Sequence, residues 1–269
     1  MKKTLVFILL LVLAVASAAC GKTAEDATGA KKEDSSSGQT IKVITTAGGY
    51  PFNATNPSTN EIEGFMVDIV KEAAKRADVQ TEVVTGEWNS LIPSLQSSKA
   101  DVIMDGMYIT DERKKEINFT DPVFGFGEGL IVQEGDTKTA SLEDLKGKTI
   151  GVQMGTSFKD MLEERSPELN LEIKTYQTLA DLLKDIQAKR IDAALADKPA
   201  FTYMKSKNPN MTYRVVDEYV PTLAGEIGLG VSKENPELLE KLNQAITEMK
   251  EDGTLTEIFE NWGVEWDIK

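Results

Sequence analysis

Three separate stretches of this chain carry residues suited to binding a charged small molecule. The first is Arg113, in the run DERKK. Its planar guanidinium can make two parallel hydrogen bonds to a carboxylate, which the ammonium of a lysine cannot. From the residue alone, a solvated arginine in this charged run is the favoured interpretation, and only a wider motif can reverse it.

The second stretch is Gly155, Thr156 and Ser157, which follow the β-branched run KTIGV and precede the helical pattern SFKDMLEE. Their backbone N–H groups are therefore expected at the positive end of a helix, where a carboxylate can bind. An ordinary helix cap by Thr or Ser fits the same pattern and is compatible with that role.

The third is Asp197, which directly follows the apolar run DAALA. Ligands of open α/β sheets gather at the carboxyl ends of the strands, and this places Asp197 at such an edge. The alternative is an aspartate that only caps the helical pattern KPAFTYM.

Composition limits the chemistry that these residues can perform. The 269 residues contain no histidine and a single cysteine, so carboxylates and lysines are the only obvious groups for proton transfer. The formal charge is −14, and it becomes −16 without residues 1–19, with 28 basic against 44 acidic residues. This balance argues against a nucleic-acid partner. No metal or cofactor is expected.

The amino-terminal segment predicts export and anchoring. Lys2 and Lys3 precede an apolar run over 5–15 and the small residues 17–19, as in a secretory signal peptide. That run is too short to cross a bilayer, and no later stretch is long enough either. Cys20 follows at once, and the segment resembles the lipobox at which bacterial lipoproteins are cleaved and acylated. Residues 20–40 then read as a lipidated cysteine and a flexible polar tether. We expect a protein on the extracellular face of the cell membrane, held by the acyl chains on Cys20.

From Ile41 onward, short β-branched runs alternate with helical patterns, which is typical of an α/β fold. Two helices have clear apolar faces, one with Phe65 and Ile69 and the other with Leu182 and Ile186. The tail is expected to form two helices broken near Gly253. The expected strands are 41–46, 81–84, 101–104, 148–152, 171–176, 192–196 and 226–231.

The stretch GEWNSLIPSLQSSKADVIMDGMYITDERKKEINFTDPV (86–123) closely resembles a segment of the bacterial extracellular solute-binding proteins for polar amino acids, family 3. Tyr50-Pro51-Phe52, GVQMGTS (151–157) and IDAALADKPA (191–200) extend the resemblance in the order of the family. The family has the type II periplasmic-binding-protein fold, in which two lobes, each a central sheet flanked by helices, are joined by a two-stranded hinge. By resemblance, lobe 1 comprises 41–126 and 227–269, lobe 2 comprises 127–226, and the hinge crossings lie near 126–129 and 222–226.

The resemblance also assigns the ligand site. It implies that Arg113 binds the ligand carboxylate together with Gly155, Thr156 and Ser157, and that Asp197 binds the ammonium group. Aromatic residues of the family line the cleft, and these match Tyr50, Phe52 and Trp88 here.

Two residues depart from the family pattern. Asp105 stands where a small residue is usual, and Tyr108 replaces a Ser or Thr that meets the ammonium, while Gly106 and Met107 keep the pattern and offer their backbone. The extra carboxylate predicts a zwitterionic or cationic ligand, unless Asp105 turns into its lobe and caps a local turn.

The sequence therefore predicts a monomeric binding lipoprotein, without enzymatic activity, that delivers an amino-acid-like solute to the permease of an ABC importer. The string GMYI also resembles family members that bind ectoine-type solutes. A ligand-sensing ectodomain, or an enzyme such as a dehydratase on the same fold, is the alternative.

Overall fold

The computed structural model describes residues 38–264. The predicted leader, Cys20 and most of the predicted tether lie outside this range. Within it, no helix combines the length and the apolar character that crossing a membrane requires.

The first lobe is built on a five-stranded sheet with the order β5-β1-β6-β14-β7. Its strands are β1 (Thr40–Thr45), β5 (Gln80–Thr85), β6 (Val102–Ile103), β7 (Asn118–Phe119) and β14 (Gly230–Val231). β1 pairs in parallel with β5 and β6, so that the carboxyl ends of these three strands lie at one edge. A small antiparallel sheet of β2 (Gly48–Gly49), β3 (Asn53–Thr55) and β4 (Ile62–Glu63) follows β1 in the chain.

The second lobe has its own sheet with the order β10-β9-β11-β8-β12. Its strands are β8 (Phe124–Gln133), β9 (Thr149–Gln153), β10 (Glu172–Tyr176), β11 (Ala193–Asp197) and β12 (Tyr213–Val215). β9 lies between two parallel neighbours, β10 and β11, as expected for strands joined by crossover helices. The α/β class and the two-lobed architecture predicted from the sequence are confirmed.

Two antiparallel strands run between the lobes. The first half of β8 pairs with β13 (Ala224–Ile227), whereas its second half belongs to the lobe 2 sheet. The single strand predicted over 226–231 is wrong, because the chain passes there from β13 into β14 of lobe 1. Gly228 allows the break, since a Cβ at this position would lie 2.8 Å from the Thr120 carbonyl oxygen.

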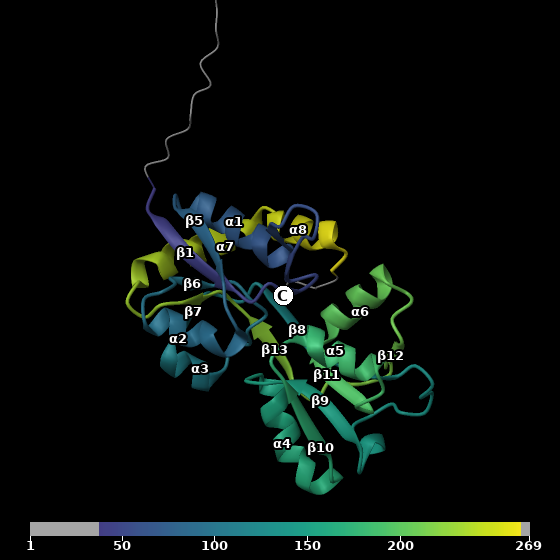
Figure 1. Cartoon of the computed structure of the whole chain (residues 1–269). Helices are drawn as coiled ribbons and strands as arrows, with labels where there is room; N and C mark the ends of the chain where they lie inside the picture. The colour runs from purple at the N-terminus through teal and green to yellow at the C-terminus, as the bar shows by residue number, and fades with distance from the viewer. Residues whose placement is uncertain (1–37, 265–269) are drawn as a thin grey trace, which may run out of the picture. The chain divides into compact units, whose positions relative to one another are not determined.

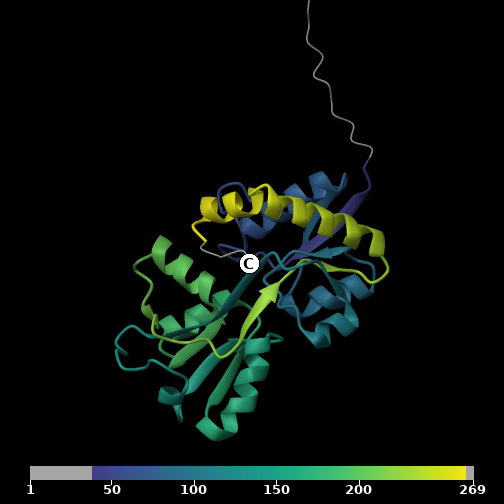
Figure 2. The same ribbon diagram turned by 180° about the vertical axis from the view of Figure 1, so that it is seen from behind.

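Helices cover both sheets (Figures 1 and 2). The helices of lobe 1 are α1 (Phe65–Arg76), α2 (Leu91–Gln96), α3 (Asp111–Glu116), α7 (Pro236–Glu251) and α8 (Thr254–Trp262), with a 3-10 turn at Trp88–Ser90. Those of lobe 2 are α4 (Ser157–Leu169), α5 (Leu179–Gln187) and α6 (Lys198–Lys207), with a 3-10 turn at Glu143–Leu145. α1, α7 and α8 pack together, while α2 contacts β1 and β6 on the other side of the sheet.

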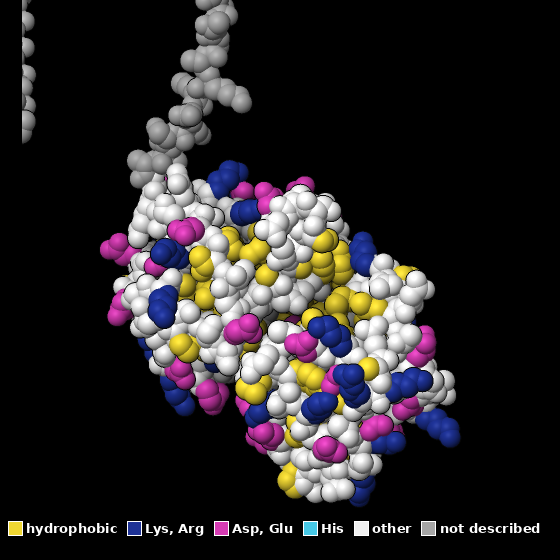
Figure 3. Space-filling model, viewed as in Figure 1, with side chains coloured by type: hydrophobic (Ala, Val, Ile, Leu, Met, Phe, Trp, Pro, Cys, Tyr) yellow, Lys and Arg dark blue, Asp and Glu magenta, His cyan; other side chains and the backbone are white. Residues whose placement is uncertain are grey.

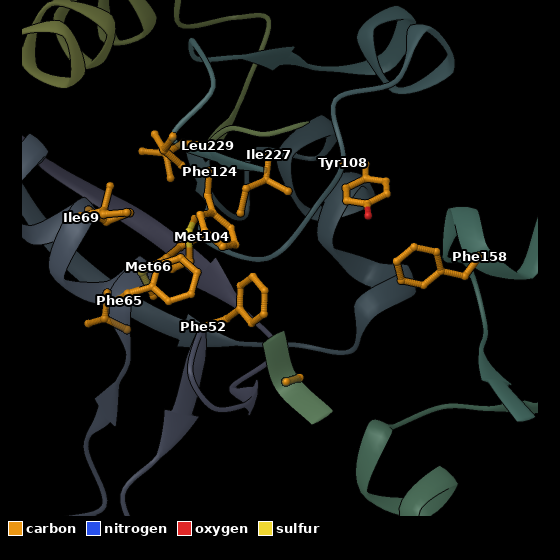
Figure 4. Packing of buried hydrophobic residues seen from close by; sticks show 14 of the residues in the cluster. Phe52, Phe65, Met66, Ile69, Met104, Tyr108, Phe124, Phe158, Ile227 and Leu229 are labelled. Atoms are coloured by element: carbon orange, nitrogen blue, oxygen red, sulfur yellow. The ribbon is translucent and has the colours of Figure 1, made fainter. Parts of the chain in front are cut away.

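The predicted helix faces are buried as expected. Phe65 and Ile69 of α1, and Leu182 and Ile186 of α5, have no exposed surface. The break between α7 and α8 falls at Gly253, whose φ of 85° is in the left-handed region that favours glycine. In Figure 4, Phe52, Phe65 and Phe124 pack together in lobe 1, while Tyr108 extends from this core towards Phe158 of α4.

Candidate ligand site between the lobes

Two adjoining cavities lie between the lobes, and they share Trp88, Gln153, Leu179 and Asp197. The first cavity is lined from lobe 1 by Trp88, Gly106, Tyr108 and Arg113, and from lobe 2 by Gln153, Thr156, Ser157, Phe158, Leu179, Leu195, Ala196 and Asp197. The second cavity adds Thr46, Gly48, Gly49, Phe52, Asn53, Gly86, Glu87, Asp105, Gln177, Thr178 and Ala200. Residues more than 80 positions apart in the sequence therefore face one space.

Arg113 lies in α3 of lobe 1 and is fixed by its own surroundings. Its Nη1 donates to the Tyr108 carbonyl oxygen at 2.9 Å, and its Nη2 to the Gly155 carbonyl oxygen at 3.4 Å. Burial lowers the pKa of Arg113, and the Asp160 carboxylate opposes this shift. No carboxylate within residues 38–264 forms an ion pair with it. The result is a partly desolvated cation, with unused N–H groups, that lines the first cavity.

Asp197 is the acidic residue that faces the same cavity from lobe 2. It occupies the N-cap position of α6, yet its side chain makes no capping hydrogen bond. Burial, together with the nearby Asp105, raises the pKa of Asp197 to about 8. A carboxylate without a partner in the described part of the chain, at the carboxyl end of β11, is suited to receive an ammonium group.

The Gly-Thr-Ser run lies at the start of α4. Thr156 caps the helix, because its hydroxyl accepts from the Lys159 backbone N–H at 3.3 Å, and Ser157 is the first helical residue. Both line the first cavity. N–H groups in the first turn of a helix have no acceptor within the helix, so the cap and a binding role coexist here.

Trp88 closes one rim of the first cavity. Its Nε1 donates to the Gly155 carbonyl oxygen at 2.9 Å, which is a direct hydrogen bond from lobe 1 to lobe 2. The guanidinium carbon of Arg113 lies 5.8 Å from the centroid of the Trp88 ring. Gly155 has a φ of 76° and lies outside both linings, but its carbonyl oxygen holds both side chains.

Asp105 lines the second cavity, but its carboxylate already has partners. Its Oδ2 accepts from the Thr46 backbone N–H and hydroxyl, both at 2.8 Å, and from the Thr45 hydroxyl at 3.3 Å. Its Oδ1 accepts from the Gly106 N–H at 2.9 Å. All of these donors belong to lobe 1, which corresponds to the turn-capping alternative. The charge of Asp105 still acts on Asp197.

Tyr108 lines the first cavity, but its hydroxyl group is not free to donate to a ligand. That hydroxyl donates to the Phe126 carbonyl oxygen in β8 at 2.7 Å. The ring packs edge-on against Phe158 with centroids 5.5 Å apart. Gly106 lies beside it, and a Cβ at Gly106 would be 3.3 Å from Phe52 Cε1 and 3.6 Å from Asp197 Oδ2, so the backbone here closely approaches both lobes.

Of the three other residues predicted to line the site, one borders a cavity and two do not. Phe52 borders the second cavity, although only 4% of its surface is exposed. Met107 is buried in a lobe 1 core cluster and lines neither cavity. Tyr50 also lies outside both linings, and β2 contributes Gly48 and Gly49 to the second cavity instead. The Tyr50 hydroxyl donates to Glu63 Oε1 at 2.5 Å.

Sequence reasoning missed several polar residues of the second cavity, among them two glutamines and a threonine. Gln153 ends β9, and Gln177 and Thr178 follow β10 directly. They lie at the carboxyl ends of the lobe 2 strands, as Asp197 does. The position after a predicted strand, which indicated Asp197, could therefore have indicated them as well. Leu179, the first residue of α5, is only partly buried and lines both cavities.

The chain is similar in sequence to known binding proteins. The family model described as bacterial extracellular solute-binding proteins, family 3, matches residues 41–265. The arginine-binding extracellular protein ArtP of Bacillus subtilis is 35% identical, with 91% of this chain and 94% of that protein covered. The histidine-binding periplasmic protein of Escherichia coli K12 is 36% identical, with 80% and 84% covered.

A solved structure agrees with these matches. An ancestral arginine-binding protein bound to arginine superposes with a TM-score of 0.78 at 35% identity, and covers 83% of this chain and 97% of that one. Because the family model spans most of the chain and the relatives match over most of their length, this chain belongs to the bacterial extracellular solute-binding proteins, family 3.

Proposed function

We propose that this protein captures an amino acid between its two lobes. Arg113, with the helix end at Thr156 and Ser157, receives the α-carboxylate, and Asp197 receives the α-ammonium. The observation that carries the proposal is that a guanidinium and a carboxyl group, neither in an ion pair within residues 38–264, line the same cavity from opposite lobes. A zwitterion satisfies both and so links lobe 1 to lobe 2.

The ligand side chain extends into the second cavity and carries a positive charge. Asp105 and the exposed Glu87 line that cavity together with Gln153 and Gln177, and none of its lining side chains is basic. An acidic side chain would meet two further carboxylates there, and burying like charges is costly. Two of the similar proteins are named for arginine and histidine, which agrees with a cationic side chain.

We further propose that the protein serves an ABC permease from an anchor at Cys20. Residues 41–126 and 227–269 form lobe 1, residues 127–226 form lobe 2, and ligand binding favours the closed arrangement that the permease distinguishes. The relatives are extracellular and periplasmic binding proteins, which supports delivery from outside the membrane.

A thermal-shift and calorimetry panel tests the ligand class. Arginine, lysine, ornithine, histidine, glutamine, ectoine, aspartate and glutamate are compared at equal concentration. A ligand at 100 times its dissociation constant adds about 2.7 kcal/mol to stability, so the preferred class is separated easily. We expect arginine or another cationic amino acid to stabilise most. Stabilisation by glutamate or aspartate above all others would contradict the charge assignment.

One observation bears on an enzymatic alternative. A carboxyl group with a pKa of about 8 can transfer protons near neutral pH, and Asp197 has that property. We propose binding without turnover, because an ammonium at Asp197 would keep this carboxylate ionised and occupied. Recovery of the bound amino acid, unchanged in mass after prolonged incubation, is the expected result, and a mass decrease would favour the dehydratase alternative.

A further inference from the structure

The lobes touch at a second place, away from both cavities. The ring of Tyr50 in lobe 1 stacks on the ring of Tyr203 in lobe 2, with centroids 5.7 Å apart and an interplanar angle of 28°. The other rim contact, from Trp88 to Gly155, involves residues of the ligand site itself. Tyr50 and Tyr203 line neither ligand cavity, so their contact joins the lobes without lining the ligand site.

The lobe 1 side of this contact has further partners within lobe 1. The Tyr50 ring also stacks on Trp262 of α8, with centroids 6.2 Å apart, and its hydroxyl is bound by Glu63. Trp262 Nε1 in turn donates to Asp68 Oδ2 of α1 at 2.8 Å. Tyr50 is therefore a fixed aromatic surface on lobe 1. In Figure 3, hydrophobic side chains gather along the line where the region of α8 meets α6.

The lobe 2 side is connected to the ligand site through one short helix. Tyr203 lies in α6, which begins at Lys198 immediately after Asp197. Six residues of helix span about 9 Å, so Asp197 and Tyr203 move together as parts of one rigid element. When a ligand ammonium holds Asp197 against lobe 1, the same movement brings Tyr203 onto Tyr50.

We propose that the stack of Tyr203 on Tyr50 is a latch that stabilises the closed state and sets ligand affinity without touching the ligand. Tyr50 and Tyr203 are thus positioning residues. The affinity test of this inference rests on the proposed function, because it requires a bound amino acid. The test of lobe position does not, because it uses the ligand-free protein. Stacked aromatic pairs contribute a factor of about 2 to 12 in an equilibrium constant.

Affinity measurements give the first test, with L-arginine as the probe. Tyr203→Ala is expected to weaken binding about threefold to tenfold, chiefly through faster dissociation, because the open state binds as before. Tyr203→Phe keeps the ring and should stay within about twofold of wild type. Thr202→Ala, an exposed position on the same helix, is the matched control. Tyr203→Gln is made alongside in case the alanine variant folds poorly.

A double-mutant cycle separates a latch from two independent effects. Tyr50→Ala and Tyr203→Ala each remove the same stack, so the double variant should bind no more weakly than the worse single variant. If the loss of affinity in the double variant equals the product of the two single losses, each ring acts through a contact other than the shared stack. Loss of affinity in Tyr203→Phe equal to that in Tyr203→Ala would likewise overturn the latch.

Energy transfer between dyes reports the lobe position without any ligand. Dyes are attached at Lys71→Cys in α1 and Glu168→Cys in α4, both exposed, with Cys20→Ser so that no other thiol is present. We expect Tyr203→Ala to reduce the short-distance population of the ligand-free protein and Thr202→Ala to leave it unchanged. If the wild-type protein binds no amino acid, the proposed function fails. The distribution of dye-to-dye distances in the ligand-free protein then tests the latch by itself. A distribution that Tyr203→Ala does not change overturns it.

Discussion

Removal of the Arg113 guanidinium is the most direct test of the ligand site. The side chain donates two hydrogen bonds, to the carbonyl oxygens of Tyr108 and Gly155. Its other N–H groups have no carboxylate partner in the described residues. Arg113→Ala would leave the ligand carboxylate desolvated and unpaired. Breaking one partner of a buried pair costs about 3–5 kcal/mol. This corresponds to a loss of roughly a hundredfold to several thousandfold in affinity.

Isothermal titration calorimetry with arginine measures this loss. Arg113→Lys should bind better than Arg113→Ala but well below wild type, because an ammonium cannot make two parallel hydrogen bonds to a carboxylate. Arg190→Ala serves as the control, since Arg190 pairs with Asp185 on lobe 2 and lines no ligand cavity. Its affinity should equal that of wild type.

The fold should survive the substitution, because the half-buried Arg113 forms no ion pair within residues 38–264, so that its removal strands no carboxylate there. Circular dichroism and the unfolding midpoint check this. A loss of affinity below tenfold in a folded Arg113→Ala protein would remove Arg113 from the site and refute the pairing on which the proposal depends.

Further predictions concern Asp197, Asp105 and Cys20. Burial raises the pKa of Asp197 to about 8, so the closed ligand-free protein holds a proton there at lower pH, and an arriving ammonium must displace it. Affinity for arginine should therefore fall as the pH drops from about 8 to 6, and calorimetry in buffers of different ionisation enthalpy should detect proton release. Asp197→Asn should bind weakly and without this slope, whereas proton uptake in wild type would contradict the assignment. Asp105→Asn should lower the free energy of unfolding by about 1–3 kcal/mol in urea titrations, because it weakens charge-assisted hydrogen bonds to Thr46, and should change affinity less than tenfold. Cys20→Ser should release the protein from the membrane fraction after a salt wash and leave its affinity intact, and persistent membrane binding would rule out the acyl anchor.

The local sequence determined the α/β class, the buried faces of α1 and α5, and the helix break at Gly253. It also indicated Asp197 and the start of α4 as edge positions. These features depend on residues close in the chain, through hydrophobic period, capping and glycine conformation. The resemblance to the family added Arg113 and Trp88, whose side chains line the first cavity.

The tertiary structure alone decided which side chains reach the cavities. Tyr50 follows two glycines in a turn, and only the pairing of β2 with β3 turns its ring towards Trp262 and Tyr203. Asp105 has its carboxylate bound by Thr45 and Thr46, about 60 positions away, which no local pattern indicates. The same holds for the break between β13 and β14. In each case the deciding contacts join distant parts of the chain, so they exist only once the sheets and lobes have assembled.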